Sequence, residues 1–105
     1  MARHMLLVLT NAAEGRDDEF NRWYDDVHLG DVLAVDGFVA AQRFELKSMA
    51  GPESPYRYLA LYEVETDDVD AVVARLGAAA GTMVLSDAMA EASALVASPI
   101  TERRT

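Results

Sequence analysis

One short run near the start of the chain decides the fold: His4-Met5-Leu6-Leu7-Val8-Leu9-Thr10. Successive side chains of a strand point to opposite faces, and this run is apolar on both. A continuous apolar run of this length predicts a strand that is covered on both sides. The run is too short to cross a membrane or to form the core of a signal peptide.

Two more extended runs lie in the middle of the chain. Tyr56 to Glu65 is largely apolar on both faces, which predicts a second interior strand. Phe38 to Leu46 alternates, with Phe38 and Phe44 on one side and Arg43 on the other. Its polar content is typical of an edge strand.

The first predicted helix begins with three acidic residues, Asp17 to Glu19, which suit the positive end of the helix dipole. We expect it to run to about Leu29, where Gly30 interrupts it and Asp31 caps one further turn. Residues three and four apart share a helix face. The stripe formed in this way consists of Phe20, Trp23, Tyr24, Val27 and His28.

The second predicted helix follows Thr66, which we expect to be its cap, and its apolar residues from Val69 to Leu76 recur at helical spacing. The segment Thr82 to Glu91 fits either a loop or a short helical turn. Ser93 to Ile100 predicts the last strand, where Pro99 is tolerable near an end or at an edge.

The element order is strand, helix, strand, strand, helix, strand, in a single domain over residues 1–105. This predicts an α+β, ferredoxin-like βαββαβ fold, with an antiparallel four-stranded sheet and both helices on one sheet face. The first and third strands are central. Because helices cover only one face, strands that are apolar on both sides need a second cover. We expect a homodimer with face-to-face sheets, which also helps a chain of 105 residues to bury enough surface.

Composition limits the partners. The net charge of −9 argues against nucleic acid and anionic membrane surfaces, and it suits a neutral or cationic small molecule better. The absence of Cys removes disulfides and thiolate chemistry, so we expect a cytoplasmic protein.

The stretch Phe20 to Val32 resembles the EthD-like family of the dimeric α+β barrel superfamily. Typical members show Asn-x-Trp-Tyr-Asp, then His-Leu-Pro-Asp-Val, then Pro-Gly-Phe. Here Gly30 and Asp36 stand where the family usually has Pro. The resemblance extends to Gly37-Phe38, Arg43-Phe44, Pro55 to Glu63 and Pro99 to Thr101.

This resemblance implies a dimeric α+β barrel whose pocket lies between sheet and helices or towards the barrel interior. Members of the superfamily include cofactor-independent monooxygenases, polyketide cyclases and dehydratases, muconolactone isomerases and haem-handling enzymes. A shared fold does not fix the reaction.

His28 is the leading catalytic candidate, because an imidazole exchanges protons near neutral pH and Asp25 or Asp31 is close enough in sequence to orient it. Tyr24, one turn earlier, is placed to donate a hydrogen bond to a substrate oxygen. The alternatives are that His28 and Asp31 only cap helix ends and that Tyr24 is a core-edge residue.

Four residues are candidates for substrate binding. Arg43 suits a developing negative charge, although it could instead pair with Glu45 at an exposed edge. The aromatic candidates could wall a pocket or simply pack in the core. No Cys or His spacing completes a metal site, and we expect neither a metal nor a cofactor. The four binding candidates are Trp23, Arg43, Tyr58 and Tyr62.

These residues favour a small cofactor-independent enzyme that acts on an aromatic or polyketide-like molecule by proton transfer through His28, as a cyclase, dehydratase, isomerase or monooxygenase does. Whether the chain is catalytic at all stays open. A non-catalytic ligand-binding or accessory dimer is the alternative, and haem handling with His28 as axial ligand is a third.

Overall fold

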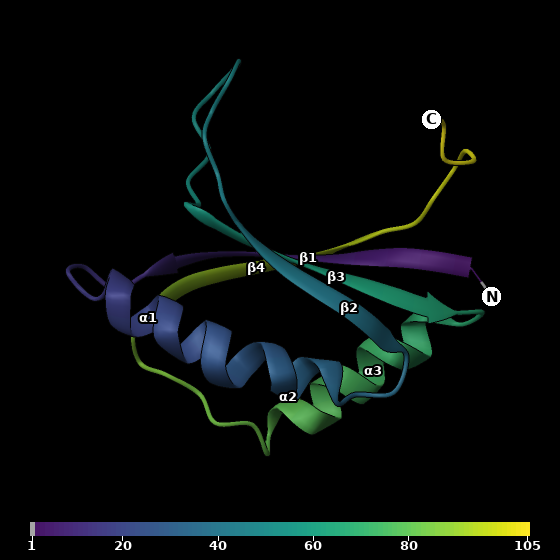
Figure 1. Ribbon diagram of the computed structural model, residues 1–105, viewed down its shortest axis with the longest axis horizontal. Coiled ribbons are helices and arrows are strands. Elements are labelled where there is room, and N and C mark those ends of the chain that lie inside the picture. Colours follow the sequence, from purple (N-terminus) through teal and green to yellow (C-terminus); the bar gives the residue numbers. More distant parts are fainter. Residues whose placement is uncertain (1) are drawn as a thin grey trace.

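A computed structural model describes residues 2–105. Four antiparallel strands form one sheet in the order β2-β3-β1-β4, and the helices lie on one side of it (Figure 1). This arrangement confirms the predicted ferredoxin-like α+β fold. The strands are β1 (Ala2–Ala12), β2 (Phe38–Glu45), β3 (Tyr58–Thr66) and β4 (Met89–Ala97).

The two strands with apolar residues on both faces are the central ones, as predicted. β1 pairs with β3 and β4, and β3 pairs with β1 and β2, so β2 is an edge strand. On the helix side of the sheet, alternate residues of β3 from Tyr58 to Val64 are buried together with Leu6 and Thr10 of β1. The opposite face has no cover within the described chain. Its leucines, all at least partly exposed, are Leu7, Leu9, Leu59, Leu61 and Leu95.

A bulge in β2 changes the predicted facing of its side chains. Phe38 pairs with Val64 and Ala40 pairs with Glu63, so Val39 is one extra residue. An extra residue shifts the alternation by one position. The expectation that Phe38 shares a side with Phe44 is therefore wrong, and Phe38 instead faces the helices together with Arg43.

The first helix is longer than predicted. It runs without a break through α1 (Asp17–Trp23), the π-helical segment η1 (Tyr24–His28) and α2 (Leu29–Leu33). Gly30 therefore does not interrupt it, and Asp31 is not a cap but lies within the first turn of α2. A glycine in a helix costs only about 1 kcal/mol relative to Ala. Burial of the apolar helix face outweighs that cost.

The second helix, α3 (Val69–Ala80), is capped by Asp68 and not by Thr66. The Asp68 carboxylate accepts a 3.2 Å hydrogen bond from the amide of Ala71, while the Thr66 hydroxyl accepts one from the amide of Asp68. β4 begins earlier than expected, at Met89, and ends before Pro99. Among residues 2–105, no helix has the length and apolar character to cross a membrane.

Candidate functional site

The centre of the predicted site is a pair of buried tyrosines. Tyr24 lies in η1 and Tyr62 in β3, and their hydroxyls share a hydrogen bond of 3.2 Å. Desolvation raises the pKa of both phenols above the ordinary value. Both therefore stay protonated at neutral pH and do not act as bases there; within the pair, the Tyr62 hydroxyl donates and the Tyr24 hydroxyl accepts.

The π-helical turn places His28 against Trp23. Residues five apart diverge in an α-helix, but the wider π turn brings them to the same side. The Trp23 and His28 rings stack at 4.7 Å between centroids, with 22° between their planes. Tyr24 meets the same imidazole edge to face at 4.9 Å. The aromatic stripe predicted from α-helical spacing is thus present, with a stacking partner that this spacing does not predict.

His28 is a half-buried imidazole in an apolar environment. Its Nδ1 atom is buried and has no hydrogen-bond partner among residues 2–105. Burial lowers the pKa of His28 below the ordinary value, and the negative charge of Asp31 opposes that change. Asp31 acts on His28 through charge, because no hydrogen bond joins the two side chains within the described residues. His28 is therefore neutral at pH 7, with one ring nitrogen protonated and the other carrying a lone pair.

The side chain of Arg43 extends from the edge strand β2 and lies between aromatic rings, where it is only 12% exposed. Its Cζ atom is 4.5 Å from the centroid of the Tyr24 ring, close enough for a cation–π contact. Its two terminal nitrogens donate to Asp25 at 2.8 Å and to Asn21 at 2.9 Å. The alternative that Arg43 pairs with Glu45 is wrong, since Glu45 binds Arg57 instead.

Tyr58 joins the sheet to the start of α1. Its hydroxyl donates a 2.6 Å hydrogen bond to the Asp17 carboxylate. Burial, and then this hydrogen bond, raise the pKa of Tyr58. Sequence reasoning did not select Asp17 or Asn21 as site residues, and it considered Asp25 only as a partner of His28, whereas Asp25 binds Arg43. Their spacing of four along one helix was the available signal, because it places all three on the side that meets Arg43 and Tyr58.

Trp23 has a packing role. It is 9% exposed, and its indole Nε1 donates a 2.9 Å hydrogen bond to the carbonyl of Val84, in the loop between α3 and β4. This bond ties the loop to the helix and satisfies the polar atom of a nearly buried indole. The flat face of the ring is occupied by His28.

The candidate residues do not share one cavity. A surface cavity of about 340 Å³ is lined by Arg43 and Tyr58 together with Asn21 and Asp25. Asp31 borders a separate cavity of about 400 Å³ with Arg75. Neither lining includes the central residues Tyr24, His28 and Tyr62. Within residues 2–105, no three His, Asp or Glu side chains are grouped to hold a metal ion.

Solved structures share this architecture. A dabb family protein with a ferredoxin-like fold from Mesorhizobium loti superposes with a TM-score of 0.67 at 14% identity, covering 96% of this chain and 100% of the other. An ethyl tert-butyl ether d (EthD) family protein from Bacillus halodurans gives a TM-score of 0.53 at 12% identity, covering 95% and 100%. The chain has the ferredoxin-like fold of the EthD and dabb proteins. The resemblance to the EthD-like group is confirmed at the level of the fold.

A third neighbour is the heme-degrader MhuD from Mycobacterium tuberculosis, whose structure holds two hemes in its active site. It matches with a TM-score of 0.60 at 20% identity, covering 96% of this chain and 99% of the other. No protein-family model and no curated protein matches the sequence.

Proposed function

We propose that this protein is a homodimer with face-to-face sheets that binds a small aromatic or apolar molecule and moves a proton on it through His28. The observation that carries the proposal is the π turn of η1, which holds between Trp23 and Tyr24 an imidazole whose buried Nδ1 has no hydrogen-bond partner among residues 2–105. Single π turns within α-helices are frequent at functional sites. A neutral imidazole can accept a proton from an acidic C–H or O–H group at neutral pH.

Tyr24 and Asp31 support His28 without touching the substrate themselves. Tyr24 is 1% exposed, so it acts as a positioning residue that fixes the imidazole plane by its edge-to-face contact. The charge of Asp31 favours the imidazolium that forms when His28 takes up a proton. The hydrogen bond between Tyr62 and Tyr24 fixes the Tyr24 ring in turn.

Arg43 and Tyr58 provide the binding element for a substrate oxygen. The carboxylate of Asp25, which now accepts from Arg43, is 57% exposed, so an incoming anionic or carbonyl oxygen can replace it at little cost. Asn21 then keeps the second guanidinium nitrogen occupied. Arg43 and His28 both contact the Tyr24 ring, so this ring couples the position of the binding group to that of the base.

The homodimer is supported by the uncovered sheet face. Two-fold pairing would bury the five leucines of this face in both copies at once. Burial of one such side chain is worth about 1.5–3 kcal/mol. A second copy of the same face is the simplest complementary surface, since it is apolar over the same area.

A non-catalytic ligand-binding dimer is the second candidate. The observation in its favour is that the Arg43 cavity does not include His28 in its lining. Haem, although the MhuD structure holds it, does not fit beside His28 here. The rings of Phe20, Trp23, Tyr24, Tyr58 and Tyr62 fill the layer between helix and sheet, leaving no slot for a macrocycle.

One experiment separates catalysis from binding. Binding of 1-naphthoate and of 1,8-dihydroxyanthraquinone is followed by the fluorescence of Trp23, which is the single tryptophan. Exchange of the acidic C–H of a bound β-keto aromatic probe with D₂O is followed by NMR. We expect His28→Ala to abolish exchange while affinity changes by less than a few fold. Exchange that survives the substitution would exclude His28 as the base, and an equal loss of exchange and affinity would favour a role for His28 in binding alone.

A further inference from the structure

Two segments project from the sheet on the side away from the helices (Figure 1). The hairpin arm, residues 46–57, connects β2 to β3, and the C-terminal arm, residues 98–105, follows β4. Every residue from Lys47 to Pro55 and from Ala97 to Thr105 is exposed. Within the described residues, neither arm is therefore buried against the rest of its own chain, except at its base.

Both arms are attached at their bases to β1. The Asn11 side chain donates to the carbonyl of Pro55 at 2.6 Å and accepts from the amide of Arg57 at 2.9 Å. Near the other end of β1, the His4 Nδ1 atom and the Ser98 hydroxyl are 2.8 Å apart and share a hydrogen bond. These contacts fix the direction in which each arm leaves the sheet.

Each arm carries one large apolar side chain in water. Met49 in the hairpin arm and Ile100 in the C-terminal arm are each 97% exposed. A single exposed apolar residue is ordinary on a protein surface. Here, however, both belong to arms that project on the side of the uncovered leucines, where an apolar partner surface would meet them.

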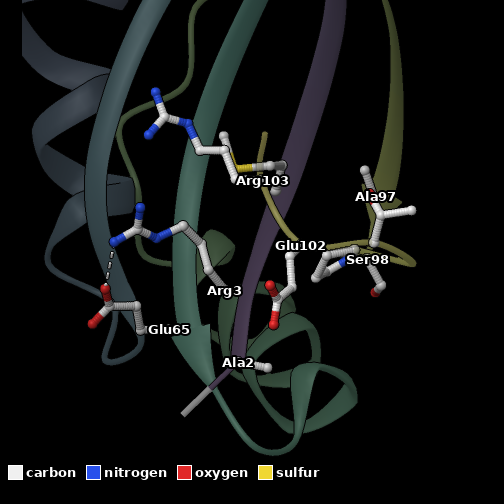
Figure 2. Close-up of a pocket in the computed structure, with 10 residues that line it drawn as sticks. Ala2, Arg3, Glu65, Ala97, Ser98, Glu102 and Arg103 are labelled. Carbon is white, nitrogen blue, oxygen red and sulfur yellow. Dashed lines mark hydrogen bonds and ion pairs between the residues drawn. The ribbon is translucent and has the colours of Figure 1, made fainter. Parts of the chain in front are cut away.

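A cleft lies beneath the C-terminal arm (Figure 2). Its volume is about 680 Å³, and its apolar lining includes Met5, Ala97 and Pro99. An ion pair of 3.1 Å between Arg3 and Glu65 borders it. Met5 and Ala97 are register partners in the sheet, so the floor of the cleft continues the uncovered face.

We propose that the two arms clasp a second copy of this chain, with Ile100 packed on the partner. This inference rests on the proposed face-to-face dimer and extends it to the arms. A closed two-fold pair brings each chain's arms beside the other chain's sheet, because both arms rise on the side where the partner lies. The partner thereby supplies the buried contacts that neither arm finds in its own chain.

The test compares four proteins that differ by one exposed aliphatic side chain. Sedimentation equilibrium gives the dimer dissociation constant of the wild type, Ile100→Asp, Leu95→Asp and Leu85→Asp. Leu85 is 64% exposed and lies in the loop between α3 and β4, away from the arms, so it controls for the added charge. Thermal melting followed by circular dichroism checks that each variant folds.

We expect Ile100→Asp and Leu95→Asp to raise the dissociation constant by about tenfold or more, because each removes apolar burial from both copies, and Leu85→Asp to leave it within about twofold. If Leu95→Asp weakens the dimer but Ile100→Asp matches the wild type, the sheet-face dimer stands and the clasp is wrong. A wild type that stays monomeric at millimolar concentration overturns both. An equal effect of Leu85→Asp and Ile100→Asp also overturns the clasp, since charge alone would then explain it.

Discussion

The Tyr62 hydroxyl donates a 3.2 Å hydrogen bond to the Tyr24 hydroxyl, and each of these side chains is 1% exposed. The bond joins the central strand β3 to the π turn that carries His28. A buried hydroxyl that loses its partner pays the desolvation penalty of an unsatisfied polar group, about 1–3 kcal/mol. The two tyrosines should therefore behave as one unit when they are substituted.

We predict that Tyr62→Phe and Tyr24→Phe each destabilise the protein by about 1–2 kcal/mol, because each leaves the other hydroxyl unsatisfied. The double variant should be no less stable than either single variant, since it removes both polar groups. Urea denaturation of the four proteins gives the coupling free energy. Tyr56→Phe, at a half-exposed position, serves as the control and should stay within about 0.5 kcal/mol of the wild type. Strictly additive effects would contradict the pairing.

Arg43 is predicted to matter through its planar, forked shape as well as its charge. Arg43→Lys keeps the charge but loses the two-point contact to Asp25 and Asn21 and the stacking on Tyr24. We expect a loss of about 1–3 kcal/mol in the free energy of unfolding. Asp25→Asn is the matched control and should cost less than about 1 kcal/mol, because Asp25 is largely exposed. If the two substitutions had the same effect, only the ion pair would be significant.

Two glycines should respond to alanine in opposite ways. Gly30 lies in α2 with open space where a Cβ would stand, so Gly30→Ala should stabilise the protein by about 0.5–1 kcal/mol. Gly37 has φ +108°, and a Cβ there would lie 2.8 Å from Cγ2 of the buried Val72. Gly37→Ala should therefore destabilise by more than about 1 kcal/mol. Thermal denaturation measures both, and destabilisation by Gly30→Ala would argue against the continuous helix.

The pH dependence of stability should report the burial of His28. Its pKa is lowered on folding, so the unfolded chain binds the proton more tightly than the native protein does. The stability that comes from neutral His28 is complete above the unfolded pKa of about 6.5 and is lost as the pH falls below that value. We expect the wild type to lose more stability than His28→Gln between pH 7.5 and pH 5.5 in urea denaturation. Identical pH slopes for the two proteins would rule out the buried neutral imidazole.

The charge of Asp31 should be measurable on the same imidazole. Because Asp31 raises the pKa of His28, Asp31→Asn should lower it further. A proton NMR titration in a His4→Gln background isolates the resonances of the single remaining histidine. Glu14→Gln, a substitution of an exposed carboxylate in the loop before α1, is the control for net charge. A shift of equal size in both variants would assign the effect to overall charge and not to Asp31.

Much of the fold could be predicted from residue patterns because those patterns are local. The two-sided apolar run of β1 and the similar run of β3 identified the central strands, and the polar residues of β2 identified an edge. The predicted ends of the helices and strands were less accurate. Thr66 and Asp68 are both favourable helix N-cap residues. Because β3 extends to Thr66, α3 begins after it and Asp68 becomes the N-cap.

Residue spacing was enough to predict which elements form, which strands are central and which helix carries the aromatic stripe with His28, because these follow from the apolar side chains along one segment. The stack of His28 on Trp23, the contact of Arg43 with Asn21 and Asp25, and the pairing of Tyr24 with Tyr62 arise instead from the packing of separate segments. The π turn and the bulge at Val39 each shift the local period by about one residue. Such shifts are set by how helix and sheet pack against each other, and no single segment encodes them.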